Sequence, residues 1–389
     1  MKLTKEELVS VLTVGFIISI RLLGIFLILP VFSVYSIQYP GSSLTLAGIA
    51  FGIYALIQSI LQIPFGWASD RIGRKPVLLF GLFLFSIGSF FCGIADDINQ
   101  LIIARIIQGS GAIGSVALAS LGDVTRPGVR AQAFTISGII IGSAFLIAIV
   151  FGPLIASEFS FSTLFYVLTL LGLIAILVTL FFFPKIKLNV TNDQAMTYRA
   201  LIQNINLRKL FISAGILSLL LNVFIFIYPL SWENLGINES NLWKVYFIVL
   251  IPSALLVFPY VRYAEKKKIL DGPSRWGWYC LIISFVLYLI GFNYKFILYS
   301  SGIMLFLGSI LYQSIFPAFL TQRIPSEQRG ASTGVYNLSY FLGASIGGMS
   351  SGFLYQNGQV LPIIFCIAVL ILWKFVGIPH PPDSKKVRY

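Results

Sequence analysis

Long apolar runs alternate with short polar segments along the whole chain. The ~30 Å hydrocarbon core of a bilayer requires a helix of about 20 residues. Apolar runs of that length predict twelve spanning segments, at about 8–34, 44–68, 76–94, 98–122, 131–156, 162–183, 208–231, 242–263, 276–293, 296–320, 330–355 and 359–378. A single strand cannot satisfy its backbone hydrogen bonds in lipid, so we expect these segments to be helices.

The first apolar run follows Lys2 and Lys5, as the apolar part of a signal peptide would. It is too long for a signal peptide, contains Arg21 and lacks a small-residue cleavage site. We therefore expect this run to remain as the first spanning helix.

The longest polar stretch divides the twelve spans into six and six. It predicts an N-terminal six-helix bundle at 1–183, a cytoplasmic linker at 184–207 and a C-terminal six-helix bundle with a short cytoplasmic tail at 208–389. The halves echo each other, because Arg130 and Arg329 close similar polar segments about half the chain apart. The predicted fold is an all-α membrane protein of two bundles related by pseudo-two-fold symmetry, an architecture typical of transporters.

The composition excludes the main soluble classes. Hydrophobic residues make up 57% of the chain and charged residues only 11%, whereas soluble domains carry about 25% charged residues. This rules out a cytosolic enzyme, a disulfide scaffold and a disordered chain. Cys92, Cys280 and Cys366 fall in or beside apolar runs at unrelated spacings, so we expect no disulfide framework, no metal site and no cofactor.

The net charge of +13 does not indicate nucleic-acid binding, because the basic residues lie in short segments between the apolar runs. If the N-terminus is inside, most of the 27 Lys and Arg residues fall on the inner side. We therefore expect a multi-pass protein of the plasma membrane with both termini in the cytoplasm. Its expected partners are the lipid bilayer, a small-molecule substrate and protons; we expect it to be a monomer.

The segment between the second and third predicted helices has an unusual density of charge. It holds one acid and three bases within six residues, bracketed by glycines: Gly66, Asp70, Arg71, Gly73, Arg74 and Lys75. A generic basic loop on the inner side would explain Arg71 and Lys75 but neither the acid nor the glycines.

Each remaining residue of this segment has an expected physical role. Gly66 would allow another helix to approach closely, and Gly73 would permit a turn with positive φ. Asp70 would face the positive N-terminal end of the eleventh helix and join the two halves. Arg74 would pair with Asp123 at the inner end of the fourth helix.

These residues resemble the G-x-x-x-D-R-x-G-R-[KR] signature of the major facilitator superfamily. In the fourth helix, Arg105, Gln108, Gly109 and Gly111 resemble the R-x-x-Q-G-x-G motif of its proton-coupled members. In the fifth helix, Ala148, Gly152 and Pro153 form a partial antiporter motif, with Ala156-Ser157 where the family has a second glycine pair.

Further stretches resemble one bacterial group, the YajR-type branch of the drug:proton antiporter family. They are Arg21–Gly24 with Leu29-Pro30, Trp243–Tyr246, Tyr263–Glu265, and Gly334–Tyr336 with Phe341–Gly343. The resemblance implies the major facilitator fold, alternating access and proton coupling. That branch can carry a soluble C-terminal domain, and we expect this chain to lack one.

The charges predicted inside the bilayer are basic. No acid lies near the middle of a span, whereas Arg21 and Arg105 lie deep within the first and fourth helices. Intramembrane charges are costly and mark functional sites, so both arginines are candidates for proton or substrate coupling, with Gln108 beside Arg105. Arg21 favours neutral or anionic cargo, although a structural pairing with helix-end carbonyls remains open. The proton would use a boundary carboxylate: Asp70 or Asp123 inside, Glu158 or Glu233 outside.

Polar side chains within the spans are candidates for a central cavity: Tyr54, Gln58, Gln62, Asn222, Tyr228, Tyr312, Gln313, Tyr336 and Asn337. Buried amides either face water in a cavity or bridge helices, and the sequence leaves both open. The tyrosines could equally be core residues. Gly152 and Pro153, with Gly343 and Gly347 in the eleventh helix, are predicted helix-packing positions.

Three function classes follow. A proton-driven antiporter that exports a lipophilic or amphiphilic solute fits the motifs best, and a proton-coupled importer of a metabolite or nutrient is the alternative. A membrane enzyme is not expected, because the spans hold no buried acid pair, His pair, Gly-Asp or His-Glu motif.

Overall fold

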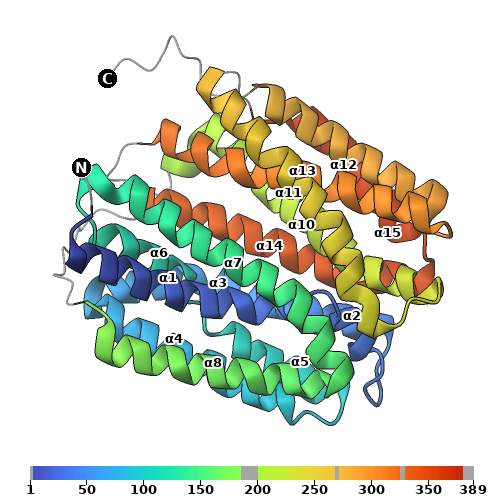
Figure 1. Ribbon diagram of the computed structural model, residues 1–389, viewed down its shortest axis with the longest axis horizontal. Coiled ribbons are helices and arrows are strands. Elements are labelled where there is room, and N and C mark those ends of the chain that lie inside the picture. Colours follow the sequence, from blue (N-terminus) through green and yellow to red (C-terminus); the bar gives the residue numbers. More distant parts are fainter. Residues whose placement is uncertain (1–2, 185–199, 268–270, 325–328, 380–389) are drawn as a thin grey trace. The chain divides into compact units, whose positions relative to one another are not determined.

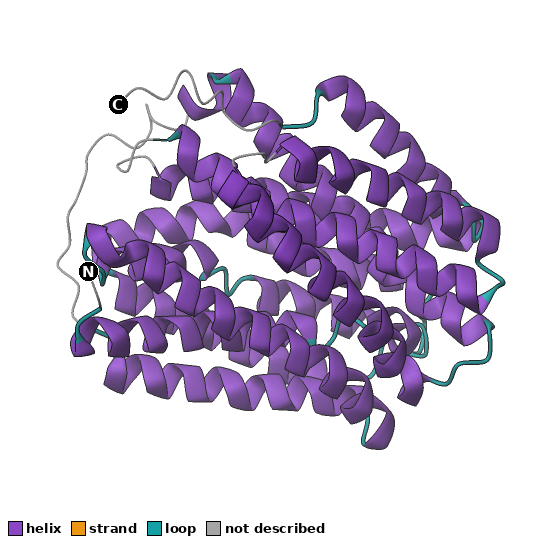
Figure 2. Ribbon diagram, turned by 45° about the horizontal axis from the view of Figure 1, so that its top comes forward, coloured by secondary structure: helices purple, strands orange, loops and turns teal. Residues whose placement is uncertain are grey.

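The computed structural model describes residues 3–184, 200–267, 271–324 and 329–379, and these residues form helices and loops with no strand among them (Figure 2). The predicted all-helical fold class is therefore confirmed. Residues 185–199 of the predicted linker and 380–389 of the predicted tail lie outside the described residues.

Contacts divide the chain into two compact units. Unit 1 comprises Met1–Asn192 with Glu239–Trp243, and unit 2 comprises Asp193–Asn238 with Lys244–Tyr389. Figure 1 traces both. The helices of unit 1 are α1 (Lys5–Phe26), α2 (Phe32–Ser36), α3 (Leu44–Ile72), α4 (Arg74–Gly93), α5 (Ile98–Gly109), α6 (Gly114–Asp123), η1 (Pro127–Val129), α7 (Arg130–Glu158) and α8 (Phe161–Phe182).

The second unit begins with a long helix and ends with a short one. Its helices are α10 (Ile205–Asn234), α11 (Leu242–Lys267), α12 (Asp271–Gly291), α13 (Lys295–Arg323), α14 (Arg329–Asn357) and α15 (Leu361–Val376). The short η2 (Glu239–Asn241), which precedes α11, belongs to unit 1.

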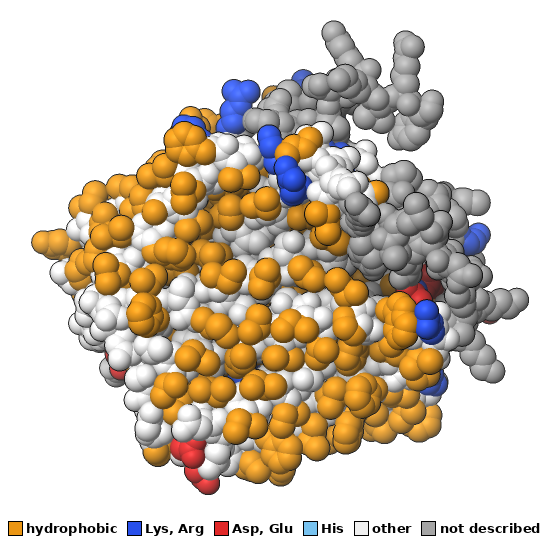
Figure 3. Space-filling model, turned by 180° about the vertical axis from the view of Figure 1, so that it is seen from behind, with side chains coloured by type: hydrophobic (Ala, Val, Ile, Leu, Met, Phe, Trp, Pro, Cys, Tyr) orange, Lys and Arg blue, Asp and Glu red, His pale blue; other side chains and the backbone are white. Residues whose placement is uncertain are grey.

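Each of the twelve predicted spans contains helix. Within the described part of the chain, ten segments are long and apolar enough to cross a membrane. The other two predicted spans are α14, which is long but rich in Gly and Ser, and α15, which is strongly apolar but only 16 residues long. Figure 3 shows one face, which hydrophobic side chains cover widely, with most of its Lys and Arg near the margin.

Two predicted spans are interrupted, which corrects the expectation of continuous helices at 8–34 and 98–122. The first helix stops at Phe26 and resumes as α2 at Phe32. Pro30 lies in this break, where it lacks an N–H and disfavours helical backbone in the preceding residue. The fourth span stops at Gly109 and resumes at Gly114. In this break Ala112 N–H bonds to Ser110 O at 2.9 Å instead of continuing the helical ladder.

The interior of unit 1 is an apolar core between closely packed helices. α1 packs on α7, α4 packs on α8, and α5 lies against both α3 and α4. The core brings together side chains from α1, α4 and α6, including Val14, Ile17, Leu78, Leu82 and Val116. Polar N-caps begin several helices, namely Thr4, Ser43, Asp97 and Ser160.

Glycines bring helices into backbone contact at the predicted packing positions. A Cβ on Gly343 would overlap the carbonyl oxygen of Gly215, and a Cβ on Gly347 would overlap that of Leu219. In unit 2 these glycines let α14 lie directly against α10. Gly152 likewise contacts the Leu27 carbonyl, and Pro153 is buried beside it inside α7. The packing predictions for Gly152, Gly343 and Gly347 are confirmed.

Candidate functional site

A single glycine joins α3 to α4 in the charged segment. Gly73 has φ +102° and ψ 154°, so it ends α3 and immediately precedes Arg74, the first residue of α4. A residue with a Cβ rarely adopts this conformation. The predicted positive φ is confirmed, and the turn fixes where the charged side chains on either side of it point.

Arg74 is the centre of an ionic cluster at this junction. Its guanidinium pairs with Asp70, one turn earlier in sequence. Its Nε donates to Asp123 Oδ2 at 2.9 Å, and its Nη1 donates to Ser69 Oγ at 2.6 Å. The predicted contact between Arg74 and Asp123 is confirmed, and it ties the end of α6 to the junction of α3 and α4.

The other two bases of the segment have separate partners. The Arg71 guanidinium lies 3.9 Å from the centroid of the Trp67 ring, a cation–π contact. Lys75 Nζ donates to the carbonyl oxygen of Leu180 at 2.7 Å and so links α4 to the end of α8.

One expectation for this segment is wrong and another stays a prediction. A Cβ on Gly66 would lie 3.7 Å from Ser115 Oγ, an ordinary contact, so packing in this structure does not require a glycine there. The contact expected between Asp70 and the start of the eleventh helix, near Arg329, Gly330 and Ala331, would join the two units and stays a prediction, because the side chains of these three residues lie outside the described ones.

Arg21 points into the interior of unit 1, and only 3% of it is exposed. One of its terminal nitrogens donates to Gln58 Oε1 on α3. Gln58 Nε2 in turn donates to the hydroxyl of Tyr54 at 2.8 Å. The amide of Gln58 thus bridges α1 and α3. The sequence had left open whether this side chain faces water in a cavity or bridges helices.

Arg105 lies over the Tyr54 ring. Its guanidinium carbon is 4.5 Å from the Tyr54 centroid and 5.3 Å from that of Phe32. Its Nε donates to Ala50 O at 3.3 Å and its Nη1 to Gln108 Oε1 at 2.5 Å. Tyr54 therefore contacts Arg105 through its ring and connects to Arg21 through Gln58.

The chain of hydrogen bonds continues to α4. Gln108 Nε2 donates to Ser89 Oγ at 2.9 Å, and both residues are buried. We call the set Arg21, Tyr54, Gln58, Arg105, Gln108 and Ser89 the two-arginine network. Ser89 and Phe32 were not predicted, and no local sequence signal distinguishes them from other core residues.

The break between α5 and α6 lies beside this network. Gln62 Oε1 accepts the backbone N–H of Ser115 at 3.0 Å, and Ser115 Oγ donates to Gln62 O at 3.1 Å. Gln62 thereby caps the start of α6 inside the unit. A Cβ on Gly114 would lie 2.6 Å from Arg21 Nη1, so the end of the Arg21 side chain passes directly over this glycine. Gly114 was not predicted, although it follows the glycine-rich motif directly.

The motif glycines have a packing role. A Cβ on Gly109 would lie 2.7 Å from the Tyr54 carbonyl oxygen, and one on Gly111 would lie 2.5 Å from that of Gly81. The two glycines hold the fourth span against α3 and α4. They therefore keep Arg105 and Gln108 at the distances of the network.

The network concentrates positive charge where acids are scarce. Arginine stays protonated in proteins, and within the described residues Arg105 forms no ion pair. The described acids of unit 1 lie at helix ends or in loops. Two buried guanidinium groups held by amides and carbonyls would attract a negative group of a ligand.

The candidates in unit 2 form no comparable cluster. The Tyr228 hydroxyl donates to Leu298 O at 3.2 Å and the Tyr312 hydroxyl to Ser274 O at 2.8 Å, so both are buried residues that bridge helices. Asn222 donates to Ser218 O in its own helix. Three further candidates are half-buried or exposed: Gln313, Tyr336 and Asn337. Glu233, at the end of α10, is also exposed.

One ionic contact was missed from the sequence. Glu7 accepts from Arg126 Nε at 2.8 Å and from Arg126 Nη2 at 3.0 Å, which joins the start of α1 to the segment after α6. The hydrogen bonds with Glu7 raise the pKa of Arg126. Thr4 and Glu7 also form a capping box. The spacing of three residues between a Thr and a Glu was the signal in the sequence that could have drawn attention to Glu7.

Comparison with known proteins identifies the family. The Major Facilitator Superfamily pattern matches residues 14–348. The inner membrane transport protein YajR of Escherichia coli (strain K12) is 32% identical over 366 residues, covering 92% of this chain and 79% of that protein. The quinolone resistance protein NorA of Staphylococcus aureus (strain COL) is 25% identical, and the alignment covers 89% of this chain and 90% of NorA.

Solved structures agree on the fold. One is a bacterial homolog of the human lysosomal transporter Spinster in an inward-facing and occupied conformation. It aligns with a TM-score of 0.76 over 96% of this chain and 97% of the homolog's chain. The nucleoside transporter NupG aligns with a TM-score of 0.72 over 95% of this chain and 99% of its own. Their identities of 14% and 15% show the fold alone. With the family pattern and the similarity to YajR, they lead to one conclusion: the chain belongs to the Major Facilitator Superfamily and is a multi-pass membrane transporter.

Proposed function

We propose that this transporter is a proton-coupled exporter of small lipophilic or amphiphilic solutes and that it works by alternating access. The observation that carries the proposal is the buried two-arginine network of unit 1. Relatives named for resistance to quinolones and to multiple drugs support export. The antiporter-like positions Gly152 and Pro153 point in the same direction.

The permanent charges of Arg21 and Arg105 favour neutral or anionic cargo over cationic cargo. A cation that approached the two guanidinium groups would be repelled, whereas a carboxylate would gain charge-assisted hydrogen bonds. Proton movement then requires a group other than these arginines, because arginine does not release its proton.

We assign the proton to a boundary carboxylate. Asp70 and Asp123 both contact Arg74, so protonation of either would weaken its hold on that guanidinium and loosen the junction of α3, α4 and α6. Glu158 and Glu233, at the other ends of their helices, are the alternatives. In this proposal the protein works as a monomer with both termini in the cytoplasm.

Import driven by protons is the second candidate. It is favoured by Ala156-Ser157, which stand where the antiporter motif of the family has glycines. The two directions make opposite predictions for a solute in a pH gradient.

Proteoliposomes with an imposed pH gradient separate these candidates. The probes are a quinolone and a lipophilic organic anion, each followed from the outer to the inner compartment. An antiporter accumulates solute in the compartment that is more acidic, whereas a symporter accumulates it in the more alkaline one. Accumulation that survives a protonophore would contradict proton coupling in either direction.

A further inference from the structure

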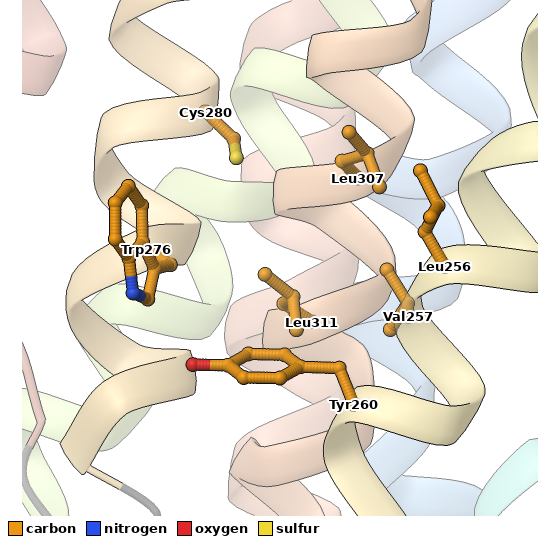
Figure 4. A pocket seen from close by; sticks show the side chains of 7 residues that line it. All are labelled: Leu256, Val257, Tyr260, Trp276, Cys280, Leu307 and Leu311. Carbon is orange, nitrogen blue, oxygen red and sulfur yellow. The ribbon is translucent and has the colours of Figure 1, made fainter.

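An apolar groove runs along one side of unit 2, between α11, α12 and α13 (Figure 4). It is lined by Leu256 and Val257 of α11, Cys280 of α12, and Leu307 and Leu311 of α13, with a volume of about 270 Å³. Val257 and Leu311 are buried at its floor, whereas Leu256 is 61% exposed at its edge. The groove is therefore open to the surroundings and apolar throughout its depth. We call it the α11–α13 groove.

The helix pairing explains why a groove exists here. α12 and α13 pack closely along their length, whereas α11 stands further from both and meets α13 through side chains. Pro252 and Pro259 lie inside α11. Each removes one intrahelical hydrogen bond and favours a bend, so α11 does not follow its neighbours as a straight helix would.

Two aromatic side chains bound the groove at one end. The Tyr260 ring extends from α11 with its hydroxyl directed towards α12 (Figure 4), where a Cβ on Gly272 would lie 2.9 Å from that hydroxyl. Trp276 lies beside it on α12 and is 59% exposed. Tyr and Trp with an apolar ring and a polar atom favour the interface between hydrocarbon and headgroups.

Basic residues gather beyond this aromatic rim. Arg262 follows Tyr260 by two residues, Arg275 directly precedes Trp276, and Lys266 and Lys267 end α11; all four are exposed. The segment 262–275 contains five basic and two acidic residues. The positive-inside rule assigns this segment to the cytoplasmic surface, where anionic headgroups attract Lys and Arg.

We propose that the α11–α13 groove binds one acyl chain of an anionic glycerophospholipid of the cytoplasmic leaflet. The chain lies on Val257, Leu307 and Leu311, and the phosphate lies beyond the rim against Arg262 and Arg275. The apolar groove, the two aromatic side chains and the basic residues follow one another along the protein. The acyl chain, the interfacial region and the phosphate of a lipid follow one another in the same order. The site is independent of the substrate and of the direction of transport.

Quenching of tryptophan fluorescence by brominated acyl chains tests the proposal in proteoliposomes of the full chain. The contribution of Trp276 is the difference between the wild type and Trp276→Phe. We expect brominated phosphatidylglycerol to quench this contribution at a several-fold lower mole fraction than brominated phosphatidylcholine. Equal quenching by the two lipids would mean non-selective contact with the bilayer and would overturn the proposal.

Charge and shape variants separate the two parts of the site. The triple variant Arg262→Ala, Lys266→Ala, Arg275→Ala should remove most of this several-fold preference for phosphatidylglycerol, since each basic residue near a membrane surface adds to the attraction. The control is the triple variant Lys5→Ala, Lys244→Ala, Lys295→Ala, which removes the same amount of charge elsewhere and should keep the preference for phosphatidylglycerol. If this control also lost the preference, the result would contradict a local site.

A groove-filling variant leaves every charge in place. Cys280→Phe should reduce quenching of Trp276 by phosphatidylglycerol while the thermal unfolding temperature stays near that of the wild type. Native mass spectrometry of the purified protein gives a second readout, as fewer bound phosphatidylglycerol molecules. Unchanged lipid binding in Cys280→Phe would overturn the assignment of the acyl chain to this groove.

Discussion

At the scale of single residues, we expect the geometry of Arg105 to matter more for transport than its charge. Its guanidinium uses one nitrogen for Ala50 O, another for Gln108 Oε1, and its flat face for the Tyr54 ring. Lysine carries the same charge but has no planar fork and cannot make all three contacts together.

Arg105→Lys is therefore expected to abolish transport as completely as Arg105→Ala. Both variants should still insert and fold, because the apolar core of unit 1 is unchanged. Transport in proteoliposomes, normalised to protein that elutes as a single species, measures the effect. A full transport rate in Arg105→Lys would show that charge alone is sufficient.

Arg21 gives a prediction about selectivity. Arg21→Ala removes one of the two buried charges and leaves Gln58 Oε1 without its donor, at a cost of about 1–3 kcal/mol. We expect the fold to survive and transport of anionic cargo to fall before that of neutral cargo. A pair of fluorescent solutes that differ only in a carboxylate tests this; equal loss for both would contradict a role in anion selection.

At the scale of elements, glycines decide which helices touch. α14 carries Gly343 against the Gly215 carbonyl, whereas for Gly334 on the same helix no described atom beyond its own turn of helix lies within 4 Å of the position of a Cβ. The two positions have the same helix propensity, so any difference between their variants reports on packing.

Gly343→Ala is expected to destabilise the protein by about 1–3 kcal/mol, since the added methyl forces α10 and α14 apart. Gly334→Ala, the matched control, should be neutral or stabilise by up to about 1 kcal/mol through the backbone entropy of the unfolded chain. Thermal unfolding in detergent measures both. A Gly343→Ala variant as stable as the wild type would show that α14 can shift freely against α10.

At the scale of the whole molecule, the ionic cluster around Arg74 joins three helices of unit 1 at one end. Partly exposed ion pairs contribute only about 0–1 kcal/mol to stability, so the cluster is poorly explained as a stabilising device. A small free energy is sufficient to shift the populations of two conformations.

Asp70→Asn and Asp123→Asn are accordingly expected to cut transport severely while expression and unfolding temperature stay near those of the wild type. The exposed acid Asp96 provides a matched control, and Asp96→Asn should transport normally. Wild-type rates in both Asp70→Asn and Asp123→Asn would exclude the cluster from the transport cycle.

Much of the architecture was predictable from local sequence. The apolar runs identified the helices because lipid forbids an unsatisfied backbone, and a glycine between two charged helix ends identified the Gly73 turn. The partnership of Arg74 with Asp123 followed from opposite charges at the same expected side of the membrane. These features depend on residue type, spacing and charge, all of which the sequence states directly.

The centre of unit 1 was decided by tertiary structure. Three contacts depend on residues more than 30 positions apart in the chain: Arg105 over the Tyr54 ring, Gln62 at the start of α6, and Gly114 against Arg21. The same holds for the α11–α13 groove, which arises because α11 stands away from two neighbours. Hydrophobic periodicity specifies that a helix crosses the membrane, but side-chain packing between helices determines what its polar residues meet.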